Sequence, residues 1–166
     1  MEGYYHKKIK SPVGELTLIA SGKGLAGVHW QHDDPQSAPL NSTECNDHPI
    51  LVETEKQLTE YFEKKRTTFT LELDFIGTPF QKKTWEALLT IPFGETRTYG
   101  EIAKQIDSPN AVRAVGMAAN KNPISIIAPC HRVIGHSGKL VGFGGGLENK
   151  SFLLRLENSR KNPTLW

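Results

Sequence analysis

The feature that most constrains the fold is a pair of helix-start signals, Thr78–Gln81 and Thr98–Glu101, in the second half of the chain. Each places a Thr three residues before a Gln or Glu, so that both side chains can accept a hydrogen bond from a free backbone N–H of the first turn. Pro79, at the first helical position, strengthens the first signal. We therefore expect a helix to begin at each place.

A third signal, Ser108-Pro109, predicts a helix that runs to about Asn120. Only a few residues separate it from the short helix that begins near Thr98. Such a pair is typical of a helix-turn-helix, although an ordinary helical hairpin gives the same pattern. The third helix is rich in Ala, Gly and Val, with Arg113 in its first turns. Small residues around an arginine would suit the minor groove of DNA, and close packing against a neighbouring helix is the alternative.

The first half of the chain is predicted to be β-rich. Residues 32–49 are polar with three prolines and predict a loop. Residues 50–64 predict a helix, and residues 69–74 predict another extended segment. An antiparallel meander is indicated by three loosely alternating segments, residues 4–9, 15–20 and 24–30. The helix would bury the face formed by Leu51, Thr54, Leu58, Tyr61 and Phe62.

The change of pattern near residue 77 predicts two domains, residues 1–76 and 77–166. The first carries 8 Lys and Arg against 12 Asp and Glu, a net charge of −4, and the second carries 12 against 6, a net charge of +6. A basic half favours a polyanion as partner, although many basic surfaces are simply solvated. We expect an α+β fold, with a small N-terminal antiparallel sheet and helix followed by a mostly helical C-terminal domain.

The composition, 37% hydrophobic and 23% charged, is that of a globular protein. No stretch approaches the ~20 apolar residues of a membrane span, and the first residues lack the pattern of a signal peptide. The two cysteines, Cys45 and Cys130, lie far apart in the sequence. We therefore expect no disulfide framework and a reducing, cytoplasmic setting.

A short motif, Pro-Cys-His-Arg-Val at residues 129–133, follows the apolar run Ile124–Ala128, which predicts a buried strand. Cys130 would then lie where a strand ends, beside His131 and Arg132. Neighbouring cations and hydrogen-bond donors favour the thiolate, so this cysteine could be a nucleophile. A structural core cysteine is the alternative, because free Cys is among the residues most often buried.

A last predicted helix begins at Leu147. Glu157 lies three and four residues after Leu154 and Leu153, so it shares their apolar face and needs a charged or donor partner there. We expect that partner to be His131, which would form a Glu–His–Cys relay that activates the thiol. A surface glutamate at a helix end is the alternative.

Together these motifs resemble the O6-alkylguanine-DNA alkyltransferase family in its bacterial form. The resemblance covers essentially all of residues 78–157, while the first half resembles the family mainly in its layout. It implies an RNase H-like first domain and a winged-helix-like second domain that carries the helix-turn-helix. The motifs that carry it are Thr78–Gln81, Ile91–Gly94, Thr98–Ala103, Arg113–Gly116, Asn120–Ile124, Pro129–Ile134, Gly145–Leu147 and Lys150–Leu154.

The resemblance implies DNA repair in which Cys130 takes an alkyl group from O6 of guanine, and also from O4 of thymine, once and irreversibly. His131 would take the thiol proton through a water molecule, and Glu157 would orient that histidine. Asn122 would steady the active-site turn. Tyr99 would push on the phosphate of the flipped nucleotide and help protonate the leaving guanine. An alkylated base must leave the duplex to be reached, which fits this scheme.

The implied partner is duplex DNA that contains O6-alkylguanine. Arg113 would enter the stack in place of the flipped base. Other residues facing the minor groove would be Ala111, Val112, Ala114 and Gly116, and the base pocket would be lined by Val133, Phe143, Gly144 and Gly145. No cofactor and no metal are implied. We expect a monomer, and cooperative loading on DNA stays open.

Two residues depart from the family pattern. Phe143 stands where many relatives carry tyrosine, and Gly144 stands where some carry serine, so two hydroxyl groups are lost. These two departures predict a changed range of accepted alkyl groups. Met117 also adds a large side chain beside Gly116 on the helix expected to face DNA.

Three other interpretations remain. A cysteine hydrolase would use the same residues but would leave the helix-turn-helix unexplained. A non-catalytic protein that binds alkylated bases would be expected to lack the cysteine, which this chain retains. A metal site is suggested by the spacings His-x2-His and Cys-x2-His, although a solvated loop explains them as well. Its ligands would be His29, His32, Cys45 and His48.

Overall fold

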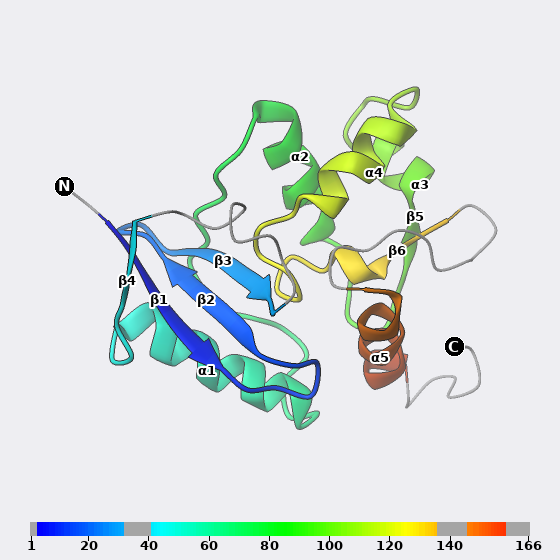
Figure 1. Ribbon diagram of the computed structural model, residues 1–166. Helices are drawn as coiled ribbons and strands as arrows, with labels where there is room; N and C mark the ends of the chain where they lie inside the picture. The colour runs from blue at the N-terminus through cyan, green and yellow to red at the C-terminus, as the bar shows by residue number, and fades with distance from the viewer. Residues whose placement is uncertain (1–2, 32–40, 136–145, 159–166) are drawn as a thin grey trace. The chain divides into compact units, whose positions relative to one another are not determined.

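The computed structural model describes residues 3–31, 41–135 and 146–158. The chain divides into two compact units, residues 1–76 and 77–166 (Figure 1). The first unit consists of a sheet and a helix, and the second is mostly helical. This is the α+β class expected from the sequence.

The first unit is built on a four-stranded sheet in the order β3-β2-β1-β4. Three of these strands form the predicted antiparallel meander, with Ile9 opposite Leu16 and Leu16 opposite Trp30. Figure 1 shows α1 lying along this sheet. The strands are β1 (Tyr4–Ile9), β2 (Leu16–Ala20), β3 (Leu25–Trp30) and β4 (Ser42–Glu44), and α1 spans Pro49–Phe62.

The strand β4 corrects part of the predicted loop over residues 32–49, of which residues 32–40 lie outside the described residues. It pairs parallel to β1, so the sheet is mixed and not purely antiparallel. The strand is held by the Cys45 N–H, which donates to His6 O at 2.9 Å, and by a 2.9 Å hydrogen bond between His6 Nδ1 and Ser42 Oγ. Because its side chains are polar and mostly exposed, the hydrophobic alternation that reveals a strand is absent.

The predicted extended segment over residues 69–74 is reduced to a single bridge. Leu73 pairs with Leu25, while the Leu25 N–H donates to Glu72 O and the Asp74 N–H donates to Leu25 O, both at 2.8 Å. The predicted helix over residues 50–64 is confirmed as α1, which buries Leu51, Thr54, Gln57, Leu58 and Tyr61. Phe62, expected on the same face, is only half-buried at the end of the helix.

Both predicted capping boxes are present in the second unit. Thr78 Oγ1 accepts from Gln81 N at 3.1 Å, and Gln81 Oε1 accepts from Thr78 N at 3.0 Å. Thr98 and Glu101 repeat the arrangement at 3.1 and 2.8 Å. The helices are α2 (Pro79–Leu88), α3 (Tyr99–Gln105), α4 (Val112–Asn120) and α5 (Leu147–Asn158). A two-stranded parallel sheet joins β5 (Arg97–Thr98) to β6 (Val133–Ile134).

Two expectations in this unit are wrong. The helix α4 begins at Val112 and not at Ser108-Pro109, because those residues form a turn in which the Ala111 N–H donates to Ser108 O. The run Ile124–Ala128 is buried but is not a strand: Ile126 has a φ of 72°, and short-range hydrogen bonds turn the chain back on itself. An apolar run of this length reports burial but cannot by itself distinguish a strand from a packed turn.

The core of the second unit positions α4. The Trp85 indole N–H on α2 donates to Ala118 O on α4 at 2.8 Å, and both Trp85 and Ala118 are buried. The helices α2, α3 and α4 pack on one another, so the consecutive helices α3 and α4 are in contact, as the predicted helix-turn-helix requires. Within the ranges that the structure describes, no helix is long and apolar enough to cross a membrane.

Candidate active site

Cys130 is the first residue of a short 3₁₀ helix, η2 (Cys130–Arg132), and is buried. Asn122 holds the turn before it, because its Nδ2 donates to Ala128 O at 2.7 Å and its Oδ1 accepts from Ile124 N at 3.0 Å. Burial raises the pKa of Cys130 to about 11, although a hydrogen bond from Asn122 and the charge of Lys150 act in the opposite direction. The thiol is therefore protonated at neutral pH and needs a base.

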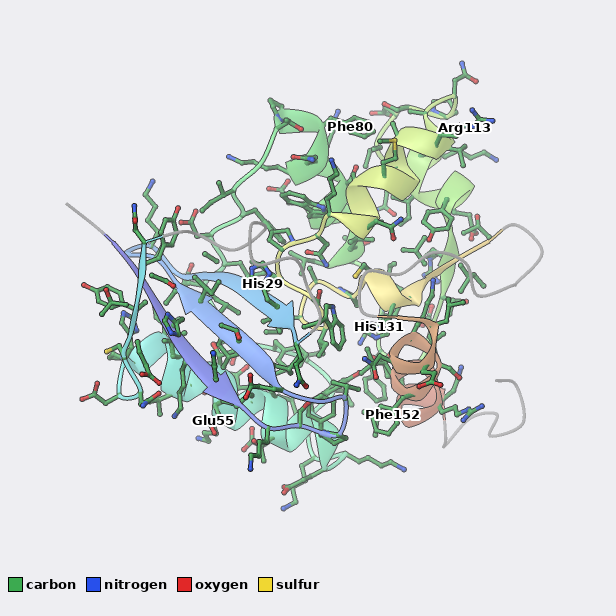
Figure 2. All side chains as sticks on the ribbon, in the orientation of Figure 1. His29, Glu55, Phe80, Arg113, His131 and Phe152 are labelled. Carbon is green, nitrogen blue, oxygen red and sulfur yellow. The ribbon has the colours of Figure 1, made fainter. Side chains whose placement is uncertain are left out.

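His131 and Glu157 lie in contact next to this cysteine. Glu157 Oε2 is 2.6 Å from His131 Nε2, and both side chains are almost fully buried, so the contact expected from the sequence is present. Figure 2 labels His131 on η2 beside α5. Burial lowers the pKa of His131, against the charge and hydrogen bond of Glu157, which makes the neutral imidazole the resting form.

The contact fixes which ring nitrogen of His131 carries the proton. A carboxylate can only accept hydrogen bonds, so Nε2 is the N–H donor and Nδ1 keeps its lone pair. Nδ1 is buried and makes no hydrogen bond within the described part of the chain. A buried nitrogen with a free lone pair, one residue from a protonated thiol, is a suitable general base.

Arg132 was expected only as a cation beside Cys130, and the structure shows it as a partner of Glu157 instead. Its Nε donates to Glu157 Oε1 at 2.8 Å, and one terminal nitrogen donates to Oε2 at 3.0 Å. Burial alone would raise the pKa of Glu157, but His131 and Arg132 outweigh burial and hold that pKa well below its ordinary value. The signal for Arg132 was its place inside the cysteine motif, directly after the histidine.

Lys150, on α5, was missed as a member of this cluster. Its side chain is fully buried, and Nζ donates to Val133 O at 2.6 Å. Burial lowers the pKa of Lys150 to about 8, against the opposing effect of Cys130. Its signal was its spacing, because it lies three and four residues before Leu153 and Leu154 on the buried face of the helix.

Tyr99 adjoins both the cysteine and the helix-turn-helix. It begins α3 and is half-buried. Burial, together with the nearby Cys130, raises the pKa of Tyr99, so its hydroxyl keeps its proton at neutral pH. A Cβ placed on Gly116 of α4 would lie 3.8 Å from the Tyr99 ring. The structure thus brings Tyr99 into one region with Cys130 and α4.

The helix α4 has one exposed side, which carries Arg113, and one buried side. Val112, Arg113, Ala114 and Met117 are exposed, Ala111 and Gly116 are half-exposed, and Val115, Ala118 and Ala119 are buried. Figure 2 labels Arg113 at the start of this helix. The residues expected to face DNA therefore lie on the open side of α4 or at its margin.

The base pocket is only partly described. Val133 is fully buried in β6, and its carbonyl accepts from Lys150, while the Cys130 carbonyl accepts from Val133 N. The other three residues assigned to the pocket, Phe143, Gly144 and Gly145, lie outside the described residues.

Two of the residues considered as metal ligands, Cys45 and His48, make hydrogen bonds within the protein. His48 accepts from Ile50 N at the start of α1, and Cys45 Sγ donates to Asp47 Oδ1 at 3.3 Å. His32 lies outside the described residues. Among the residues that are described, no three His, Cys, Asp or Glu side chains come together as metal ligands would.

Comparison with known proteins places these features in one family. Residues 4–75 match "6-O-methylguanine DNA methyltransferase, ribonuclease-like domain", and residues 79–159 match "6-O-methylguanine DNA methyltransferase, DNA binding domain". The chain is 49% identical over 156 residues to a methylated-DNA–protein-cysteine methyltransferase of Mycobacterium tuberculosis, covering 94% of this chain and 93% of that protein. A protein of the same name from Methanosarcina mazei is also 49% identical, with 94% and 98% covered.

A solved structure agrees with the sequence comparison. The crystal structure of Mycobacterium tuberculosis OGT in complex with DNA matches with a TM-score of 0.87 and 47% identity, covering 97% of this chain and 98% of that one. Both halves of the chain, its fold and its cysteine motif therefore point to the same conclusion: the chain belongs to the 6-O-methylguanine DNA methyltransferase family.

Proposed function

We propose that this protein repairs DNA by moving an alkyl group, methyl above all, from O6 of guanine to its own Cys130. The observation that carries the proposal is the buried row of Glu157, His131 and Cys130. Glu157 contacts Nε2 of His131, Nδ1 makes no hydrogen bond within the described part of the chain, and the preceding residue carries a protonated thiol. The similarity to methylated-DNA–protein-cysteine methyltransferases supports the same chemistry.

The proton and the methyl group move in opposite directions. His131 Nδ1 takes the thiol proton of Cys130, through one water molecule as the family resemblance implies, and the charge that develops on the imidazole is stabilised by the Glu157 carboxylate. A bond forms between Sγ and the methyl carbon while the bond from that carbon to O6 breaks. The electron pair of the broken bond stays on guanine, which then takes a proton with the help of Tyr99.

The reaction converts the Cys130 thiol to a thioether, so each protein molecule reacts once. A thioether has no proton to lose, and the row that deprotonates a thiol provides no means of cleaving an S–C bond. The methyl donor is the DNA itself, so the chemistry requires neither a cofactor nor a metal. We accordingly propose a stoichiometric transfer, one alkyl group per protein molecule, with guanine restored in the DNA.

In this proposal the helix-turn-helix gives access to the damaged base by extruding its nucleotide from the duplex. A base inside a duplex is unreachable, and extruding it costs a few kcal/mol, less for a badly paired lesion. Arg113 would fill the vacated place in the stack, while Ala111, Val112, Ala114 and Gly116 let α4 approach the minor groove. Asn122 would keep the cysteine turn rigid, and Tyr99 would press on the phosphate of the extruded nucleotide.

The partner is proposed to be duplex DNA bound by a monomer, in the cytoplasm where a bacterial chromosome lies. The second unit carries a net charge of +6, so binding should weaken with salt and depend little on sequence. O4-alkylthymine is proposed as a further substrate, since it presents an alkyl group on an equivalent exocyclic oxygen. The pocket is assigned to Val133, Phe143, Gly144 and Gly145.

Intact-protein mass spectrometry tests the proposal. The protein is incubated with a duplex that contains one O6-methylguanine, with Cys130→Ala and Cys45→Ala as matched variants. The wild-type protein and Cys45→Ala should gain one methyl group, and Cys130→Ala should gain none. Product guanine in excess of protein would instead favour a hydrolase or another turnover enzyme. Tight binding without any mass change would favour a non-catalytic binding protein.

A further inference from the structure

Glu157 receives more hydrogen bonds from Arg132 than from the histidine it serves. His131 contacts Oε2 at 2.6 Å, while Arg132 contacts Oε1 at 2.8 Å and Oε2 at 3.0 Å. Two nitrogens of one guanidinium on two oxygens of one carboxylate form a bidentate pair, which fixes the plane of the carboxylate as well as its charge. Arg132 therefore fixes the orientation of the Glu157 carboxylate.

Arg132 is itself held on further sides. Its other terminal nitrogen donates to Ile91 O at 2.6 Å, and its guanidinium carbon lies 5.8 Å from the centre of the Phe93 ring. Both groups belong to the segment that follows α2. The side chain is buried, so the cation is fixed by the fold and cannot shift to suit the protonation state of His131.

The charge of Arg132 matters because His131 cannot supply it. A buried carboxylate without a permanent cation tends to take up a proton, and a neutral imidazole offers it only a hydrogen bond. One extra proton on the Glu157–His131 pair removes Nδ1 as a base in either of two ways. On His131, the proton occupies Nδ1; on Glu157, the carboxylic acid donates to Nε2, and the ring then carries its own proton on Nδ1. Arginine keeps its charge at every accessible pH, and it repels a second positive charge on the imidazole.

We propose that Arg132 is a positioning residue, which keeps Glu157 ionised and aimed at the Nε2–H of His131 and so keeps the Nδ1 lone pair available to the thiol of Cys130. This inference rests on the proposed methyl transfer. Arg132 touches neither substrate nor thiol in this scheme and acts only through Glu157. Among the described residues, the titratable groups that face the cluster are Cys130 and His131 on η2, Lys150 and Glu157 on α5, and Tyr99 at the start of α3.

Two substitutions separate the charge of Arg132 from its shape. Arg132→Met keeps most of the volume and removes the cation, while Arg132→Lys keeps the cation but not the two-point contact. The half-exposed pair of Arg97 with Glu95, at 3.1 Å, offers Arg97→Met as the matched control. Circular dichroism and thermal unfolding establish first that each variant is folded.

The first readout is the pH dependence of methyl transfer from the lesion duplex under single-turnover conditions. With Arg132→Met the rate at neutral pH should fall by about 10²-fold, the order of magnitude of a general-base contribution, and the acid limb of the profile should move to higher pH. With Arg132→Lys the acid limb should stay near that of wild type while the rate falls less, by about tenfold. Arg97→Met should match wild type. A merely structural role would lower the active fraction without moving the acid limb.

The second readout needs no substrate. Nitrogen-15 shifts of the His131 ring report its tautomer directly, and the wild-type protein at pH 7 should show a neutral ring protonated on Nε2. In Arg132→Met the ring should take up a proton at higher pH than in wild type. If wild-type protein shows this tautomer but transfers no methyl group, the proposed function fails while the role of Arg132 toward the histidine stands.

Several results would overturn the inference. A folded Arg132→Met protein with a wild-type acid limb and wild-type ring shifts would show that Glu157 does not need the arginine. If Arg132→Met does not fold, Arg132→Lys decides, and a rate and tautomer equal to wild type would count against the two-point contact. An Nδ1–H or doubly protonated ring in the wild-type protein at pH 7 would contradict the inference outright.

Discussion

The two cysteines of the chain occupy contrasting surroundings, although the pKa of each thiol is raised. At Cys45, outside the core, the hydrogen bond to Asp47 raises the pKa, since an anion next to the thiol disfavours the thiolate. At Cys130 burial is the main cause, and Asn122 and Lys150 oppose it. Cys45 has the carboxylate of Asp47 as its neighbour, whereas Cys130 has the neutral imidazole of His131 at the next position in the chain.

The comparison shows that the direction of a pKa shift does not identify a nucleophile. A buried thiol that stays protonated is protected from adventitious electrophiles, and the base beside it removes the proton only when a methyl group is in place to be attacked. Reactivity at Cys130 is therefore a property of the row formed with His131 and Glu157. Four predictions test this contrast, from the largest expected effect to the smallest.

The largest effect is expected from exchanging sulfur for oxygen at each cysteine. Cys130→Ser should lose methyl transfer completely, because a serine hydroxyl is a far weaker nucleophile with a much higher pKa. Cys45→Ser should transfer at the wild-type rate. Single-turnover assays on lesion duplex measure both, and residual transfer in folded Cys130→Ser would place the acceptor elsewhere.

Glu157→Gln should give the next largest effect, through both rate and stability. An amide can no longer fix the Nε2–H tautomer by charge, so transfer should slow by about 10²-fold or more. Arg132 would also be left buried without its anion, which typically costs about 3–5 kcal/mol of unfolding free energy. Chemical denaturation measures the loss of unfolding free energy. A Glu157→Gln protein as stable as wild type would contradict the claim that buried Arg132 depends on the Glu157 carboxylate.

The same carboxylate should make wild-type stability fall in acid. The pKa of Glu157 is lowered on folding, so its contribution is fully present above the unfolded value of about 4.3 and is lost as pH falls toward the folded value. Glu157→Gln should lack this component. Urea unfolding between neutral and acidic pH measures the difference, and parallel curves for the two proteins would argue against it.

Lys150→Met should have a smaller effect, confined to one cysteine. The charge of Lys150 opposes the effect of burial on the pKa of Cys130, so Lys150→Met should raise that pKa further. Alkylation by iodoacetamide near pH 7, where Lys150 still carries its charge, should slow by up to about tenfold, one pKa unit. Cys45 in the same sample should react at an unchanged rate. Lys104→Met, at an exposed position on α3, is the control. Equal slowing of both thiols would point to a general loss of structure.

Much of the second unit could be predicted because its signals are local. The capping boxes at Thr78 and Thr98 depend on residues three apart, and both were found where the sequence indicates. The inward face of α5 followed from spacing, which placed Glu157 correctly. The contact with His131 spans 26 positions in sequence, and it could be expected only because a buried carboxylate needs a partner.

What the sequence did not reveal depended on long-range backbone pairing or on polar burial. The strand β4 is polar and is recruited by its hydrogen bonds to β1, so nothing in residues 42–44 marks it. The turn at Ile126 is as apolar as a strand would be. Arg132 and Lys150 are types that are mostly exposed, and their burial follows from partners on other elements, Glu157 and the carbonyls of Ile91 and Val133.

The central claim is that Cys130 reacts from the protonated state with the help of a neighbouring base. The most direct test is a thiolate absorbance titration of the Cys45→Ser protein, with single-turnover methyl transfer measured over the same pH range. The account predicts a titration midpoint near 11 together with efficient transfer at pH 7. A Cys130 that is already thiolate at pH 7, or a transfer rate that only follows the thiolate fraction, would contradict it.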